Sequence, residues 1–316
     1  FSNLGGLAGV YRTPAIRAEV RAVYTNAPPI APYRGAGRPE AIACVELAID
    51  RAARDLGLDR IDLRRRNMIR PEELPFRTGL TFTYDSGDFP AGMELALTLA
   101  DAAGFETRRA AAAARGRLRG LGVANAIESS AGMLDEGVEV RIEPDGSALA
   151  LTGSVNHGQG HETMLAQIVS AALGLDPALV RVAQGDTDRG PRGVGSFGSR
   201  TACLAGSAAL RAAEAVAERL RTLGGEALES APTDILLEDG VARVAGTDYA
   251  VAFAELAAKS PETLAQTARF AADQGATFPN GTHVCEVEID PETGALSIER
   301  YTVVDDVGTA LNPMIV

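Results

Sequence analysis

Three glycine-rich turns carry the residues of this sequence that are best suited to hold a ligand. The first turn, 156–163, reads Asn-His-Gly-Gln-Gly-His-Glu-Thr and lies between an expected strand at 148–155 and an expected helix. Glycines let backbone N–H groups approach an anion closely, and a helix start adds unpaired N–H donors and a favourable dipole. Gln159 supplies a neutral amide that can hold a cofactor or an oxo group without competing for protons. An ordinary loop that caps a helix is the alternative for this turn, and for the turn at 193–201, when either is taken alone.

The second turn, 193–201, reads Gly-Val-Gly-Ser-Phe-Gly-Ser-Arg-Thr and precedes an expected helix at 202–220. Ser199 and Thr201 are hydroxyl donors at a helix start, and Arg200 can fork onto a phosphate. Two such helix starts suit the pyrophosphate of a dinucleotide-like ligand. The spacing G-x-G-x-x-G does not indicate a Rossmann site here, because a Pro interrupts the lead-in 189–192. In addition, the acidic residues about 20 positions later fall inside a helix.

The third turn, 33–40, reads Tyr-Arg-Gly-Ala-Gly-Arg-Pro-Glu, and its glycines flank Ala36. This pattern predicts a tight loop that either lines a small cavity or simply caps the helix that follows. His157 and His161 are four residues apart, but the glycines between them disfavour the helix that would make them a zinc pair. The adjacent Asp305 and Asp306 lie in an expected strand, so their side chains should point to opposite faces.

The elements expected to position these turns form an α+β architecture of mixed sheets with packed helices. Alternation predicts a strand at 17–24, and apolar spacing predicts helices at 39–56 and 90–103. Two strand–turn–strand patterns, 138–151 and 285–298, predict hairpins of similar design and suggest an internal duplication in the second domain. We expect a first domain at 1–107, a linker at 108–119 and a second domain at 120–316.

Composition limits the class of function. The net charge of −12 argues against a nucleic-acid surface, so the basic run Arg64–Arg66 is interpreted as a solvated or subunit-facing patch. No uncharged apolar run approaches about 18 residues, so a membrane span is not expected. The three cysteines are far apart and form neither a zinc nor an iron–sulfur ligand set. Redox chemistry would therefore need another cofactor and an electron acceptor outside this chain.

Five motifs occur in an order and spacing that carry a resemblance. They are Tyr-Arg-Gly-Ala-Gly-Arg-Pro-Glu-Ala at 33–41, Gly-Gln-Gly-His-Glu-Thr at 158–163, Gly-Asp-Thr-Asp at 185–188, Phe-Gly-Ser-Arg-Thr at 197–201 and Asp-Val-Gly-x-x-x-Asn-Pro at 306–313. Together they resemble the molybdopterin-binding large subunit of the xanthine dehydrogenase, aldehyde oxidase and carbon-monoxide dehydrogenase family, over essentially the whole chain. The first motif is similar to form II carbon-monoxide-dehydrogenase-like sequences.

The resemblance implies a role for each matching residue. Arg34 and Gly35 would approach molybdenum, which is held through the pterin dithiolene rather than by a protein ligand, and Ala36 would line the substrate pocket. The cofactor implied is molybdopterin cytosine dinucleotide. The residues that would hold it are Gly158, Gln159, Gly160, His161, Phe197, Gly198, Ser199, Arg200 and Thr201. Members that oxidise CO carry a copper-binding Cys in the loop that corresponds to the third turn, 33–40. Here Gly35-Ala36-Gly37 supplies no Cys, so no copper is expected.

The implied reaction is hydroxylation of an aldehyde or an N-heterocycle with oxygen derived from water. Electrons would leave through an iron–sulfur small subunit and an FAD medium subunit, in a cytoplasmic dimer of heterotrimers. The family's catalytic base is a Glu expected beyond Val316, so residues 1–316 are expected to be a fragment that is inactive alone. Two alternatives remain open: a non-catalytic cofactor-binding or assembly subunit, and an unrelated nucleotide-binding α+β protein.

Overall fold

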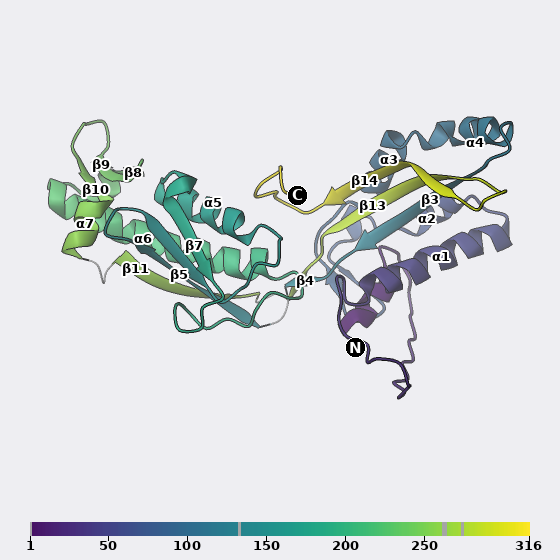
Figure 1. The fold of residues 1–316 in the computed structure, drawn as a ribbon, viewed down its shortest axis with the longest axis horizontal. Coiled ribbons are helices and arrows are strands. Elements are labelled where there is room, and N and C mark those ends of the chain that lie inside the picture. Colours follow the sequence, from purple (N-terminus) through teal and green to yellow (C-terminus); the bar gives the residue numbers. More distant parts are fainter. Residues whose placement is uncertain (1, 132–133, 261–263, 273–274) are drawn as a thin grey trace. The chain divides into compact units, whose positions relative to one another are not determined.

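The computed structural model describes residues 2–131, 134–260, 264–272 and 275–316. The chain divides into two compact units, each built from segments that are distant in the sequence (Figure 1). Unit 1 contains residues 1–129 and 277–309, and unit 2 contains residues 130–276 and 310–316. The segment 108–119, expected to be a linker, contains the end of one helix and the start of one strand of unit 1. The compact units thus divide elsewhere, and the domain boundary at 108–119 stays a prediction.

Unit 1 is an antiparallel sheet with helices packed against it. The sheet has the order β14-β13-β3, and α3 contacts both β13 and β14 while α1 and α4 contact β3. Its elements are η1 (Ser2–Ala8), α1 (Arg38–Leu56), α2 (Arg60–Asn67), η2 (Pro71–Glu73), β1 (Phe76–Arg77), β2 (Thr83–Tyr84), α3 (Phe89–Leu99), η3 (Ala102–Gly104), α4 (Phe105–Ala113), β3 (Leu118–Ile127), β13 (Asn280–Ile289) and β14 (Leu296–Asp306).

A buried polar cluster joins α1, α2 and β3 in unit 1. Arg64 is fully buried, and its guanidinium donates to Glu46 at 2.9 Å and to Asp50 at 2.6 Å. It also donates to the backbone carbonyl of Val123 at 3.2 Å. The interpretation of Arg64 as part of a solvated patch is therefore wrong. The two carboxylates lie one turn apart on α1, so both can pair with the Arg64 guanidinium. The sequence of the basic run does not reveal these partners.

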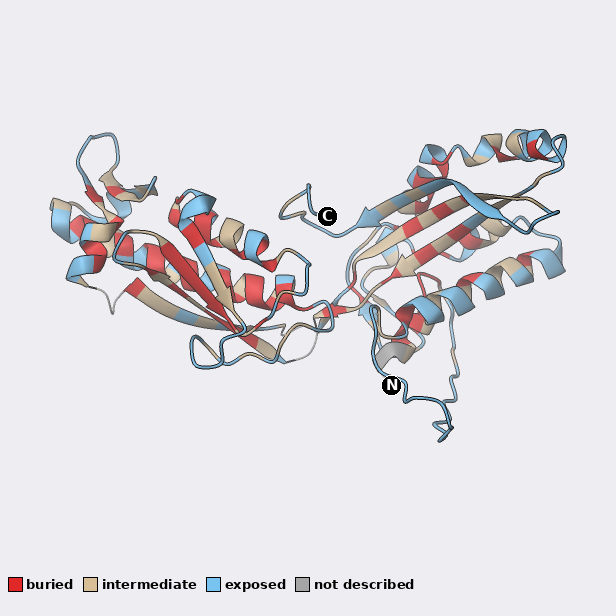
Figure 2. Cartoon of the chain, in the orientation of Figure 1, coloured by how far each residue is buried: buried red, intermediate tan, exposed pale blue. Residues whose placement is uncertain are grey.

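Unit 2 is a four-stranded sheet, order β11-β5-β6-β7, covered by α6 and α5. Figure 2 shows the buried residues concentrated on β5, β6 and α6, where small alanines such as Ala208, Ala209 and Ala212 allow close packing. Its elements are β4 (Ser130–Ala131), β5 (Asp135–Ile142), β6 (Ala148–Thr152), α5 (His161–Leu173), η4 (Pro177–Leu179), β7 (Val180–Gln184), α6 (Thr201–Leu228), η5 (Pro232–Asp234), β8 (Ile235–Glu238), β9 (Val241–Val244), β10 (Ala250–Ala252), α7 (Phe253–Lys259), β11 (Ala265–Ala271) and β12 (Ala276–Thr277).

The expected elements are found with one exception. Both hairpins form, β5–β6 in unit 2 and β13–β14 in unit 1, and the α+β class is confirmed. The helices expected at 39–56 and 202–220 form as α1 and α6, and α6 continues to Leu228. The strand predicted at 17–24 is wrong, because these exposed residues pair with no strand in the described part of the chain. Alternation alone does not make a strand without a neighbouring edge to pair with.

Candidate functional site

The turn at 156–160 joins β6 to α5 and is shaped by Asn156. The Oδ1 atom of Asn156 accepts hydrogen bonds from the backbone N–H groups of Gly158, at 2.9 Å, and Gln159, at 3.0 Å. Gly158 and Gly160 both have left-handed backbone conformations, with φ of 106° and 76°. A Cβ added at Gly158 would meet open space, so the exposed side of this turn has room for a ligand.

Gln159 belongs to this turn, whereas His161 is the first residue of α5, and the two side chains differ in exposure. Gln159 is exposed, and its Oε1 accepts from the backbone N–H of His157 at 2.5 Å, so the amide nitrogen is the end suited to donate to a ligand. His161 is only 5% exposed, and its Nδ1 atom has no hydrogen-bond partner among the described residues. Burial lowers the pKa of His161, so the neutral imidazole is favoured.

The turn at 193–199 leads into α6 and lies against the first turn. Ser196 connects the two segments through two hydrogen bonds. Its hydroxyl donates to the Val155 carbonyl at 2.6 Å and accepts from the Val155 N–H at 3.0 Å. Gly198 and Ser199 have left-handed φ angles of 64° and 51°, and a Cβ at Gly198 would meet open space. Phe197 is 48% exposed, while Thr201 is buried at the first position of α6.

Both helices begin without a side-chain cap. Neither Gly160, before α5, nor Arg200, before α6, makes a side-chain hydrogen bond to the helix start. The first N–H groups of a helix have no partner within the helix, so two adjacent uncapped starts offer donors and positive dipole ends to an anion. The described residues therefore fit a phosphate-bearing ligand, and the buried unpaired nitrogen of His161 adds a polar group at the same place.

The Arg200 side chain differs from the sequence expectation that it forks onto a phosphate. Arg200 is 2% exposed, and its Nη1 atom lies 2.9 Å from Oε2 of Glu136, a residue of β5 that is equally buried. Its Nη2 atom donates to the Asp135 carbonyl at 2.8 Å. Both Nη atoms are thus bound to protein groups inside unit 2, whereas the buried Nε atom has no hydrogen-bond partner among the described residues.

The segment 310–316 also contributes to this part of unit 2. Asn312, from the last of the quoted motifs, donates from Nδ2 to Oε1 of Gln167 on α5 at 3.2 Å. A Cβ built on Gly160 would lie 3.7 Å from the Ile315 side chain. The segment 310–316 therefore contacts α5 through Asn312 and lies beside the first turn at Ile315.

The turn at 33–38 belongs to unit 1, so the structure does not fix its position relative to the two turns of unit 2. Gly35, Ala36 and Gly37 have successive left-handed φ angles of 88°, 51° and 92°. Such a conformation is costly for alanine, and strained backbone of this kind is often found at functional sites. Arg34 is exposed, whereas Arg38 at the start of α1 is buried and forms an ion pair with Glu128.

A cavity of about 260 Å³ lies beside this turn. Among the residues that line it are Arg38, Pro39, Ile42, Glu128 and Asp305. Burial raises the pKa of Glu128, while its hydrogen bond from Ser129 and its pairing with Arg38 lower it. The cavity thus offers both an apolar wall and a partly buried ion pair to a small molecule.

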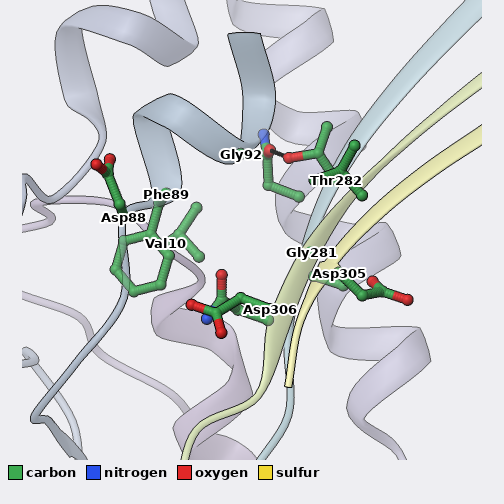
Figure 3. Close-up of a pocket in the computed structure, with 12 residues that line it drawn as sticks. Val10, Asp88, Phe89, Gly92, Gly281, Thr282, Asp305 and Asp306 are labelled. Atoms are coloured by element: carbon green, nitrogen blue, oxygen red, sulfur yellow. Dashed lines mark hydrogen bonds between the residues drawn. The ribbon is translucent and has the colours of Figure 1, made fainter. Parts of the chain in front are cut away.

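A smaller hollow of about 60 Å³ in unit 1 lies between α3, β13 and β14 (Figure 3). Asp305 and Asp306 both border it, but Figure 3 shows their carboxylates pointing away from one another, as strand alternation predicts. Asp306 accepts from the Gly308 N–H at 2.9 Å. In the described residues no group of three or more His, Cys, Asp or Glu side chains could hold a metal ion. No helix there is long and apolar enough to cross a membrane.

Sequence reasoning missed three residues that shape the site in unit 2. Asn156 has a recognisable signal, because an Asn two residues before a glycine is typical of an Asx turn. Ser196 lies inside a quoted turn, but its link to Val155 joins segments that are distant in the sequence. Glu136 gives no local signal, since it reads as one position in an alternating strand.

Two uncapped, glycine-rich helix starts on one α+β unit are typical of proteins that bind a phosphate-bearing ligand through backbone N–H groups. Comparisons with known proteins identify the family. Two sequence profiles, each described as a molybdopterin cofactor-binding domain, match residues 2–68 and 97–316. The chain belongs to the molybdopterin cofactor-binding domain family. The resemblance drawn from the five motifs is therefore confirmed.

Individual relatives support the same assignment. The gamma subunit of the 6-hydroxypseudooxynicotine dehydrogenase complex of Paenarthrobacter nicotinovorans is 35% identical over 98% of this chain and 41% of that protein. The carbon monoxide dehydrogenase large chain of Hydrogenophaga pseudoflava is 33% identical over 98% of this chain and 42% of that protein. The solved structure of quinoline 2-oxidoreductase from Pseudomonas putida 86 has a TM-score of 0.88 and 36% identity over 99% of this chain and 43% of its own. The chain thus spans less than half the length of these relatives.

Proposed function

We propose that this chain holds molybdopterin, in its cytosine dinucleotide form, as part of the large subunit of a molybdenum hydroxylase. The observation that carries the proposal is the pair of uncapped helix starts tied together by Ser196 and Val155. Backbone donors on two adjacent turns match a ligand with two phosphates. The family profiles name the same cofactor class.

The residues are assigned as follows. The turn residues Gly158, Gln159 and Gly160, with His161, bind one part of the cofactor, and residues 197–201 bind another through their backbone and hydroxyl groups. Arg34 and Gly35 approach the molybdenum, and Ala36 lines the substrate pocket. When bound, the molybdenum centre supplies two-electron oxidation with oxygen from water. These residues bind, orient and exclude water, and none is assigned to base catalysis.

The substrate class proposed is an aldehyde or an N-heterocycle. The loop residues Gly35, Ala36 and Gly37 carry no thiolate for a copper ion, which argues against copper-dependent oxidation of CO. Two of the relatives are named for oxidation of quinoline and of a nicotine derivative. We propose further that an iron–sulfur small subunit and an FAD medium subunit accept the electrons, in a cytoplasmic dimer of heterotrimers.

Cofactor analysis of the holoprotein tests the proposal. We expect stoichiometric molybdenum and a pterin that releases CMP on hydrolysis, and turnover of N-heterocycles or aldehydes in preference to CO. A purified holoprotein without molybdenum and pterin would reject the proposed function. A cofactor-bearing complex that oxidises none of these substrates would instead favour a non-catalytic binding subunit.

A single substitution, Gln159→Ala, tests the assigned turn. The loss of one hydrogen bond to a charged ligand costs about 1.5–3 kcal/mol, so molybdenum occupancy under limiting cofactor should fall at least about tenfold. Asn67→Ala is the matched control, because it removes an exposed amide from α2 in unit 1. Wild-type occupancy in Gln159→Ala would contradict the role of this residue.

A further inference from the structure

The buried Arg200 guanidinium contacts the second turn, residues 193–199. Besides its ion pair with Glu136, Arg200 donates to the Gly195 carbonyl at 3.4 Å, and its guanidinium carbon lies 5.2 Å from the centre of the Phe197 ring. Gly195 and Phe197 both belong to the turn at 193–199. One buried side chain therefore contacts the turn at two points and anchors it to β5 through Glu136.

Glu136 contacts the same turn from the other side of the ion pair. Burial raises the pKa of this carboxyl, while the charge of Arg200 and the nearby Val194 backbone N–H lower it. A Cβ added at Gly193 would overlap Oε1 of Glu136, which shows how closely the turn lies on this carboxylate. Glu136 and Arg200 are only 1% and 2% exposed as side chains, so neither charge is solvated and each depends on the other.

Besides this ion pair, the described contacts of the turn include the close packing of Gly193 on Gly153. Gly195, Gly198 and Ser199 all have left-handed backbone conformations, and Cβ atoms added at the two glycines would meet open space. A segment of this kind samples many shapes unless other groups fix it. A further side-chain anchor is Ser196, which binds Val155, the residue immediately before the first turn.

We propose that the buried Glu136–Arg200 pair is a positioning device that presets the shape of the turn at 193–199 for the cofactor. This inference rests on the proposed function. Arg200 then acts on the cofactor through the turn and does not bind a phosphate with its guanidinium. Glu136, which lies on a strand outside every glycine-rich motif, becomes a determinant of cofactor retention.

The test compares Arg200→Met, Glu136→Gln and the double variant as holoproteins. The readout is the half-life of bound molybdenum and CMP-releasable pterin after dilution. Both single variants should shorten this half-life about tenfold, the lower end of what loss of a supporting partner costs at metal sites. The double variant should lose no more than either single one, because both changes disable one unit. It also leaves no unpaired buried charge, so it remains informative if a single variant does not fold.

The matched control is Arg211→Met. Arg211 also lies on α6 and packs over an aromatic ring, that of Phe270 at 4.5 Å, but it is exposed. Its replacement should leave the half-life unchanged. If Arg200 instead binds a phosphate directly, Arg200→Met shortens the half-life while Glu136→Gln leaves it unchanged or prolongs it. That pattern, or a wild-type half-life in every variant, would overturn the proposal.

A second readout uses cofactor-free protein and separates this inference from the proposed function. Arg189 and Arg192 are exposed trypsin sites immediately before the turn. If the pair orders the turn, cleavage there should be about tenfold faster in the double variant than in Arg211→Met. Equal cleavage rates would overturn the positioning role even when the wild-type holoprotein contains its cofactor. A wild type that lacks molybdenum would reject the proposed function and leave this readout intact.

Discussion

Replacing Gly153 by alanine should displace the turn at 193–199 and weaken cofactor retention. Gly153 follows β6, and a Cβ added there would lie closer than 3.0 Å to the backbone nitrogen and Cα of Gly193. Because both of these atoms belong to the backbone, no change of side-chain rotamer relieves the overlap. The two chain segments must move apart.

The magnitude follows from this contact. Carbon atoms pack at about 3.5–4.0 Å, so the separation must grow by roughly 1 Å. Overpacking costs about 1–3 kcal/mol, and we expect roughly 1–2 kcal/mol because the largely exposed turn can yield while buried β6 cannot. For a unit of this size that lowers Tm by roughly 2–8 °C. A displacement of about 1 Å can cost roughly 100-fold in function, so cofactor half-life should fall more sharply than stability.

The assay pairs thermal unfolding with molybdenum and pterin release from the holoprotein. Gly92→Ala is the control: it lies in α3, has open space around an added Cβ and has no left-handed φ. Alanine should stabilise that helix by about 0.5–1 kcal/mol and leave cofactor release unchanged. If Gly153→Ala keeps the wild-type Tm and half-life, the close packing of Gly153 on Gly193 does not govern the turn.

Three further substitutions test other features of the two units. The pKa of His161 is lowered chiefly by desolvation, so the unfolded state binds the proton more tightly. Its contribution to stability is complete above about pH 6.5 and is lost as pH falls from there through the lowered pKa of the folded state. The fall in Tm between about pH 7.5 and 5 should therefore be smaller in His161→Gln. Arg64→Met should lower the free energy of unfolding of unit 1 by about 3–5 kcal/mol in chemical unfolding, because Glu46 keeps a buried charge without its partner. A decrease of less than about 1 kcal/mol would show that the cluster is solvated. Ser196→Ala removes both hydrogen bonds to Val155 and should shorten the half-life of the bound cofactor a few-fold. The effect on Tm should be small, since the turn is exposed. An unchanged half-life would mean that the two turns act independently.

Features determined by neighbouring residues could be predicted from the sequence. The turn at 144–146 joins β5 to β6 because Pro, Asp and Gly suit a reversal there, and alternation on both sides sets the faces. The starts of α5 and α6 were predictable for the same reason, since glycines end the turn and apolar spacing begins the helix. The family resemblance added the cofactor class, which spacing alone leaves open.

Features that depend on distant partners could not be predicted. Residues 17–24 alternate like a strand, but pairing requires a neighbouring edge that no local pattern reveals. Arg64 reads as one of three basic residues, and only the folded position of α1 brings Glu46 to it. Arg200 reads as a phosphate ligand because Arg at a helix start so often is one, yet the structure gives it a buried carboxylate.

The burial of Arg200 bears on how an acidic chain could bind an anionic cofactor. With a net charge of −12, the chain as a whole does not attract phosphates. A site made of surface cations would have to bind a phosphate against the repulsion of this net negative charge. Backbone N–H groups at two helix starts are neutral donors whose dipoles act only at close range. The affinity of such a site depends on the shape of the turns more than on charge. Under the proposed function, the groups that fix this shape, Gly153, Ser196 and Glu136, therefore matter as much as the groups that contact the cofactor.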